Sequence, residues 1–203
     1  MSLVEIVERL LTSYGVDTGK FGQGTAKTLS QLLKEIEDKE STLDIINGQI
    51  VRSVSVISAI LKRRDGKVLV EQSQHFYPTA TREEYYRSRL MPLCEKIKSN
   101  EDVHSALKRA LDEELGIKLV EVNLITCSTI IEESYSNSYP GLLTRYIVHN
   151  CLCEITEERD EFDYTEYFSD GQRRVTASWK FYSIDDIRNL SNQYNKNLTT
   201  VGL

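Results

Sequence analysis

The sequence predicts an α+β protein in which a pair of helices precedes a domain of strands and further helices. Three observations support this class. Apolar residues repeat at helical spacing in two stretches of the first 45 residues and again from Glu101 to Ile117. Asp65-Gly66 gives a strong hairpin signal between two β-rich stretches. We therefore predict a helical extension at residues 1–45 and a main domain at residues 46–203.

The composition is typical of a folded protein without a membrane segment. Of the 203 residues, 40% are hydrophobic and 28% are charged. The net charge of −6 disfavours non-specific binding to nucleic acid or to an anionic membrane. No apolar run approaches the length of a membrane span, and the first residues are too acidic for a signal or transit peptide. We expect a cytoplasmic protein without a membrane partner, which could form a homodimer.

The four cysteines do not have the spacing of a metal site. Their positions are Cys94, Cys127, Cys151 and Cys153. They form no CxxC pair, and no histidine spacing completes a zinc site. We predict buried thiols, and neither a disulfide nor a metal role.

The first helix is predicted at residues 2–14, where Ser2 and Glu5 have capping-box spacing. A second amphipathic helix is predicted from about Thr25. The glycine-rich connector at residues 16–24 lacks the strand and the Gly-Lys-Ser/Thr ending of a phosphate loop, so we interpret it as a turn.

The main domain is predicted to open with a strand at residues 50–61 and a return strand at residues 67–72. Residues 73–98 are predicted as a long connection, with a helical turn as the alternative. The candidate substrate-binding cations in it are Arg87, Arg89 and Lys96. The tyrosines that could stack on a nucleobase are Tyr77, Tyr85 and Tyr86.

The helix predicted from Glu101 to Ile117 carries an unusual pair of carboxylates. Ser99 and Asp102 have capping-box spacing, and Gly116 ends the helix. Glu114 falls on the apolar side, where a charge needs a partner or a metal. The neighbouring Glu113 lies one turn after Arg109. The carboxylates of Glu113 and Glu114 could therefore bind a hard cation such as Mg²⁺.

This helix resembles the second half of the Nudix box, R-E-U-x-E-E-x-G-U, where U is aliphatic. The matching residues are Arg109, Leu111, Glu113, Glu114, Gly116 and Ile117. Glu101 matches the isolated glutamate of the box. Two positions depart from the pattern. Glu95 stands where the box has its leading glycine, and Ala110 stands where it has the glutamate of R-E-U.

The resemblance implies a Nudix-like α/β/α sandwich with a mixed sheet, and it does not extend to residues 1–45. It also implies Mg²⁺ or Mn²⁺ held by Glu113 and Glu114, with Arg109 and Glu101 in the catalytic set. The implied reaction is hydrolysis of a nucleoside diphosphate linked to another moiety. In the family the glutamate missing at Ala110 binds metal or positions water, so the general base is unassigned.

The rest of the domain is predicted to contain strands at residues 120–132, 144–155 and 173–184, with a last helix capped by Ser183 and Asp186. The acidic stretch at residues 154–170 is predicted as a loop. Several Nudix enzymes take their general base from such a loop. The candidates here are Glu157, Glu158 and Glu161. His149 is interpreted as structural.

Two other interpretations remain beside the hydrolase. A catalytically inactive Nudix-fold module could bind a nucleotide, an RNA end or a protein partner, and Ala110 favours this alternative. An isopentenyl diphosphate isomerase is disfavoured, because the stretch that carries its catalytic cysteine has no counterpart in the sequence.

Overall fold

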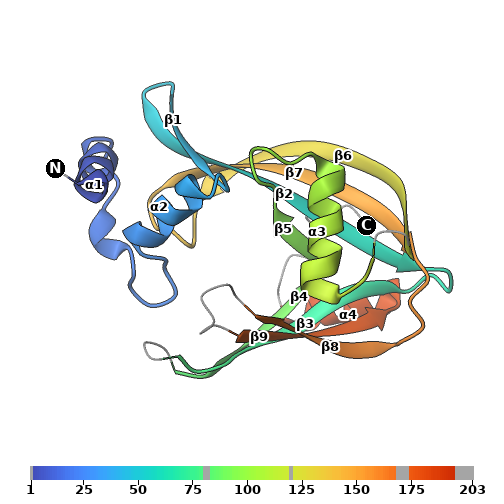
Figure 1. Ribbon diagram of the computed structural model, residues 1–203. Helices are drawn as coiled ribbons and strands as arrows, with labels where there is room; N and C mark the ends of the chain where they lie inside the picture. Colours follow the sequence, from blue (N-terminus) through green and yellow to red (C-terminus); the bar gives the residue numbers. More distant parts are fainter. Residues whose placement is uncertain (1, 80–82, 119–120, 168–173, 195–203) are drawn as a thin grey trace. The chain divides into compact units, whose positions relative to one another are not determined.

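A computed structural model describes residues 2–79, 83–118, 121–167 and 174–194 (Figure 1). Within these residues it has four α-helices and nine strands, which confirms the α+β class. The helices are α1 (Leu3–Ser13), η1, a 3-10 helix (Thr18–Lys20), α2 (Leu29–Glu37), α3 (Val103–Leu115) and α4 (Ile184–Tyr194). The strands are β1 (Thr42–Ile46), β2 (Gln49–Arg63), β3 (Val68–Phe76), β4 (Tyr85–Met91), β5 (Leu93–Lys96), β6 (Val122–Tyr135), β7 (Leu143–Ile155), β8 (Glu161–Tyr167) and β9 (Arg174–Tyr182).

The chain forms two compact units, each assembled from three segments of the sequence. The segments of the first unit are Met1–Val56, Lys96–Val103 and Thr129–His149. Those of the second unit are Ile57–Glu95, His104–Ser128 and Asn150–Leu203. The domain boundary after residue 45 stays a prediction. No helix among the described residues has the length and apolar character needed to cross a membrane.

The strands follow the order β6-β7-β2-β3-β9-β8, with β1 and β5 paired to β2 and β4 paired to β3. The predicted hairpin is confirmed, because β2 and β3 pair as antiparallel neighbours around the turn at Gly66. Gly66 has a φ of 87°, which a residue with a side chain rarely adopts.

The first unit contains the predicted helical pair. The Ser2 hydroxyl accepts a hydrogen bond from the Glu5 amide, and the Glu5 carboxylate accepts one from the Ser2 amide, as predicted. The second helix begins at Leu29 and not near Thr25, because Thr28 forms its capping box. The apolar cluster that joins helix and strand residues here includes Leu11, Val16, Leu32, Ile50, Tyr139 and Leu142.

The second unit places helices on the two faces of an antiparallel segment of four strands, β4, β3, β9 and β8 (Figure 1). On one face, the Tyr164 hydroxyl of β8 donates to the Asp112 carbonyl of α3 at 3.1 Å. On the other face, Ile187 of α4 packs in a cluster with Val68 and Val70 of β3. The predicted Ser183–Asp186 cap at the start of α4 is confirmed.

Gly116 ends α3 beside the ring of Tyr164. Its φ is 64°, and a Cβ atom there would lie 2.7 Å from Tyr164 Cε2. A glycine is therefore required both for the left-handed turn and for the close approach of β8. The start of this helix differs from the prediction. It begins at Val103, so Ser99 and Asp102 both precede it, and the predicted position of a capping box inside the first turn is wrong.

Two segments predicted as loops contain strands. β4 and β5 lie within residues 73–98, and β8 lies within residues 154–170, so the loop predictions and the helical alternative are wrong for these residues. Rings at the end of β3 and the start of β4 pair across the strands: Phe76 stacks on Tyr85, and His75 stacks on Tyr86. Such cross-strand pairs are non-local, so a local pattern does not reveal them.

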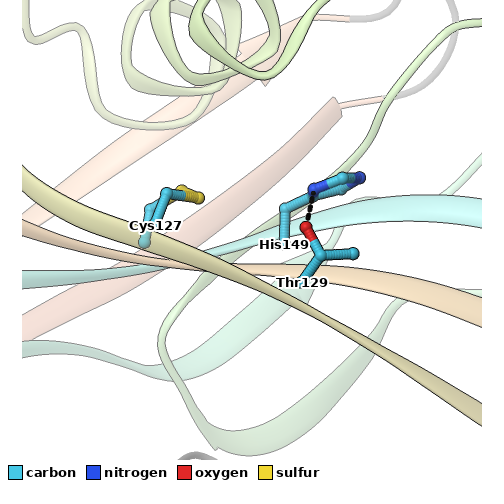
Figure 2. Close-up of a disulfide and its surroundings, with 4 residues drawn as sticks. Cys127, Thr129 and His149 are labelled. Atoms are coloured by element: carbon cyan, nitrogen blue, oxygen red, sulfur yellow. Dashed lines mark hydrogen bonds between the residues drawn. A yellow bond between two sulfur atoms is a disulfide. The ribbon is translucent and has the colours of Figure 1, made fainter.

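The cysteine prediction is wrong for two of the four residues. Cys127 of β6 and Cys151 of β7 form a disulfide (Figure 2). Cys94 and Cys153 are free. The two bonded residues lie 24 apart in sequence on neighbouring strands, a pairing that only the sheet topology creates. His149 Nδ1 shares a hydrogen bond with Thr129 Oγ1 at 2.9 Å, which agrees with a structural role.

Candidate functional site

Glu114 is the residue from which the candidate site of the second unit is built. It lies on the last turn of α3, whose buried side chains are Ala106, Leu107, Ala110, Leu111 and Leu115. Burial, together with the nearby carboxylates of Glu166, Glu95 and Glu71, raises the pKa of Glu114 to about 8 against the opposing effect of Arg89. A carboxylate in this position attracts a proton or a cation.

The strand register explains why carboxylates from separate strands face Glu114. On β9, Trp179, Ala177 and Val175 alternate on the buried face. Their partners on β3 are Glu71, Gln74 and Phe76, and a register shift after Glu71 keeps these three on one face. Their partners on β8 are Phe162, Tyr164 and Glu166. Directly paired residues point to the same side of a sheet. Because Tyr164 contacts α3, Glu71 and Glu166 lie on the face that α3 covers. We call this surface the α3 face.

Glu71 is almost fully buried, at 3% exposure. Its Oε2 atom lies 2.9 Å from Arg89 Nε, whereas the buried Oε1 atom has no hydrogen-bonding partner among the described residues. Burial raises the pKa of Glu71 above its ordinary value, against the effect of Arg89. A buried carboxylate oxygen without a hydrogen bond is costly, so this atom is suited to accept a proton or a metal ion.

Two of the predicted substrate-binding cations also reach the α3 face. Arg89 pairs with Glu71, and Arg87 donates to the side-chain oxygen of Gln74. Burial and the nearby charge of Arg89 lower the pKa of Arg87 below its ordinary value. Positive charge is therefore concentrated beside the carboxylates, which suits a phosphorylated ligand.

Arg109 connects the box helix to β5. Its Nη1 atom lies 3.2 Å from Glu95 Oε1 and 3.1 Å from Glu113 Oε2. The predicted proximity of Arg109 and Glu113 is thus confirmed. The Glu113 side chain is 52% exposed, whereas that of Glu95 is 27% exposed. Glu95 occupies the position at which the Nudix box has its leading glycine. It is the more buried of these two partners of Arg109.

The third predicted cation and the isolated box glutamate belong to the first unit. Lys96 lies 2.9 Å from Glu35 and 2.8 Å from Glu40, so it is engaged in a structural ion-pair network. Glu101 Oε2 accepts a hydrogen bond from the Lys98 amide at 3.0 Å. Their roles in substrate binding and catalysis stay predictions.

The predicted general-base candidates differ in their surroundings. Glu157 binds Arg159 through two 2.9 Å hydrogen bonds and one of 2.6 Å. Glu161 lies 2.9 Å from Lys180, and Glu158 is exposed. The carboxylate with the largest effect on the pKa of Glu114 is instead Glu166, from the same acidic stretch.

The residues of the α3 face fit a hard divalent cation in their donor chemistry. Mg²⁺ and Mn²⁺ prefer carboxylate oxygens, and here the carboxylates of Glu166, Glu95 and Glu71 lie near the partly buried Glu114. As they stand, no three histidine, cysteine or acidic side chains of the described residues converge on one point as a preformed metal site. A bound cation would require these side chains to move inward.

Sequence reasoning missed Glu71 and Glu166 as site residues. A signal for Glu71 existed, because alternation in the strand places it on the same side as the buried Leu69. Glu166 had no comparable signal, since β8 was interpreted as a loop. Ala110 is fully buried, so a glutamate at this position of α3 would have to enter the core.

Comparisons with known proteins give weak structural similarities. No family model matches the chain, and no curated protein matches it. An Ap4A hydrolase of C. elegans is 16% identical, with 69% of this chain and 87% of that one covered at a TM-score of 0.41. A Nudix hydrolase from Nitrosomonas europaea is 20% identical, with 66% and 75% covered at 0.38. The Nudix hydrolase RenU of M. smegmatis is 11% identical, with 66% and 74% covered at 0.36. At these scores, catalytic properties have to be inferred from the chain's own residues.

Proposed function

We propose that this protein is a Mg²⁺- or Mn²⁺-dependent hydrolase of a nucleoside diphosphate linked to another moiety. The observation that carries the proposal is Glu114, which is partly buried on the α3 face opposite Glu71 and Glu166 and is only partly compensated by Arg89. A purely structural site would not retain buried acidic groups without matching cations.

Glu114, Glu113 and Glu71 are the proposed ligands of the cation. When bound, such a cation offsets negative charge on a diphosphate and acidifies a water molecule. Arg109 holds Glu95 and Glu113 in place through the ion pairs that it forms with both. Arg87 and Arg89 bind and orient the phosphates. Glu166 is the proposed acceptor of the proton from the attacking water, because it faces Glu114 from β8.

The test is hydrolysis of a panel of nucleoside diphosphate derivatives with Mg²⁺ and with Mn²⁺. The panel contains ADP-ribose, nucleotide sugars, dinucleoside polyphosphates, NADH, coenzyme A and capped RNA. We expect turnover that Glu114→Gln reduces by about a hundredfold or more. Asp112→Asn is the matched control, because the Asp112 carboxylate is exposed on the same turn of α3. The hydrolysis rate of this variant should equal that of the wild type.

Glu166→Gln separates the proposed base from the metal ligands. It should lower kcat while leaving the metal-dependent rise in Tm intact, because a base is not needed to hold the cation. No turnover by folded protein across the panel would contradict the proposed hydrolase. It would favour the inactive binding module, which the alanine at position 110 also favours.

The cytoplasmic location and the homodimer stay predictions within this proposal. Disulfides persist mainly in oxidising compartments, so counting free thiols after rapid alkylation in cells tests the location through Cys127 and Cys151. Light scattering of the purified protein tests the homodimer.

A further inference from the structure

The three tyrosines that the sequence offered for base stacking lie on different faces of the sheet. Tyr85 pairs with Phe76, and Phe76 pairs with Val175, which lies on the α3 face. Tyr86 pairs with His75, one residue along β3, and therefore points to the opposite side. The Tyr77 ring lies 4.0 Å from the His75 ring, on that same opposite side. Of the three tyrosines, Tyr85 is therefore the one that shares a face with the proposed phosphate-binding residues.

Tyr85 is the outer layer of a stack of three groups. Its ring lies 4.3 Å from that of Phe76 at an interplanar angle of 5°, and the Arg87 guanidinium carbon lies 5.3 Å from the centre of the Phe76 ring. Tyr85 remains 39% exposed. The stack thus ends in an aromatic ring that is fixed from below and open to solvent, an arrangement that binds planar rings.

The spacing between the stack and the charged groups of β4 matches the spacing between the base and the phosphates of a nucleotide. Tyr85 and Arg87 are two residues apart on β4, which is about 7 Å along a strand. Arg89 and its partner Glu71 follow after another two residues on that strand. A ligand lying along this face would meet an aromatic ring first, then two guanidinium groups, and then the carboxylates around Glu114. A nucleoside diphosphate presents a planar base, a ribose and phosphates in the same order.

We propose that Tyr85, supported by Phe76 and Arg87, is the nucleobase-binding site of this protein. This inference rests on the proposed function for the position of the phosphates, and it deepens that function by assigning the base to a defined surface. Binding by stacking accepts any nucleobase, because every base has an aromatic face. Selection among bases would come from other contacts.

Tyr86 provides a matched control on the neighbouring residue. It is 70% exposed and stacks on His75 with ring centroids 4.1 Å apart, so it is at least as available to a ligand as Tyr85. It lies on the face opposite to α3, where the charged groups beside the rings include Arg174, 3.4 Å from the Tyr77 ring, and Glu84, 2.5 Å from His75 Nε2. A general affinity of exposed tyrosines for nucleotides would act through both residues equally.

The experiment is calorimetric titration of the full chain, in the presence of Mg²⁺, with ADP, GDP, CDP and UDP and separately with inorganic pyrophosphate. We expect Tyr85→Ala to weaken nucleoside diphosphate binding about tenfold or more, as for removal of one base-stacking side chain. Tyr85→Phe should restore it, Tyr86→Ala should leave it unchanged, and pyrophosphate binding should be the same in all variants. A Tm within about 2 °C of the wild type shows that Tyr85→Ala is folded.

Three results would overturn the inference. They are unchanged nucleotide affinity in folded Tyr85→Ala, equal losses in Tyr85→Ala and Tyr86→Ala, and no binding of any nucleoside diphosphate to the wild type. A failure of the proposed hydrolase function alone would give a different result. In that case the wild type binds ADP through Tyr85 and yet hydrolyses no member of the substrate panel.

Discussion

Each of the two units shields a glutamate from solvent, Glu35 almost fully and Glu114 in part, and the surroundings of the two residues are opposite. In the first unit, Glu35 contacts Lys27 at 2.6 Å, Lys96 at 2.9 Å and Arg52 at 2.5 Å. Burial alone would raise the pKa of Glu35, but these three cations lower it to about 2. In the second unit, burial and the acidic neighbours of Glu114 raise its pKa to about 8.

We interpret Glu35 as a charge shielded for stability and Glu114 as the charge used in the proposed function. Glu35 is fully compensated, so it can remain ionised and hold α2 against β2 through Arg52, whose side chain is 4% exposed. Glu114 is compensated only in part, so the folded protein carries an electrostatic cost that a proton or a cation removes. We therefore expect substitutions of the two glutamates to change stability in opposite directions.

The largest effect is expected for Glu35→Gln, which leaves Arg52 buried without its carboxylate. The free energy of unfolding at neutral pH should fall by about 3 kcal/mol, the usual cost of breaking a buried ion pair. Urea unfolding followed by circular dichroism measures this change.

The control for this variant is Glu37→Gln on the exposed side of the same helix, which should change stability by less than about 0.5 kcal/mol. The pH dependence adds a second criterion. Because the pKa of Glu35 is lower in the folded protein, its stabilisation is complete above about pH 4.5 and is lost as the pH falls towards 2. Equal losses in both glutamine variants would contradict the role of the network.

A smaller effect of opposite sign is expected for Glu114→Gln. The folded-state pKa of Glu114 lies above the unfolded value of 4.5, so the wild type loses stability as the pH rises from about 4.5 to about 8. The variant lacks this loss and should be more stable by about 1–3 kcal/mol at the upper end, in the absence of divalent cations. Tm measured across this pH range tests the prediction.

Mg²⁺ should affect the stability of the wild type and of Glu114→Gln differently. It should raise the Tm of the wild type at about pH 8, and this rise should be absent in Glu114→Gln and present in the Asp112→Asn control. Cation binding near neutral pH should also release protons, which calorimetry in buffers of different ionisation enthalpy detects. A destabilised Glu114→Gln variant would show that this glutamate is compensated after all.

The smallest change in stability is expected for Glu71→Gln, because Glu71 is intermediate between the other two glutamates. Arg89 forms an ion pair with one of its oxygens, and the other oxygen is buried without a hydrogen bond among the described residues. Loss of the ion pair and relief of the buried charge should nearly cancel, leaving about 1 kcal/mol or less.

The same variant should move the titration of Glu114 to lower pH, since one repelling carboxylate is removed. Carbon-detected NMR of the glutamate side chains reports this midpoint directly. An unshifted midpoint would mean that Glu71 does not act on Glu114.

Local patterns in the sequence determined much of the fold. Capping-box spacing located the starts of α1 and α4, and the Asp65-Gly66 turn located the hairpin between β2 and β3. Helical spacing placed Glu114 on the apolar side of α3, where its environment raises its pKa. These features depend on residues within a few positions of one another, so they can be read from the chain alone.

Only the tertiary structure decided which distant side chains complete each site. The Cys127–Cys151 disulfide, the contact of Lys96 with Glu35 and the arrival of Glu166 opposite Glu114 all follow from how distant segments pair and pack. The one-residue alternation of β4 likewise assigned Tyr85 and Tyr86 to different faces. Such relations depend on register and packing between segments far apart in sequence, which local composition and spacing do not specify.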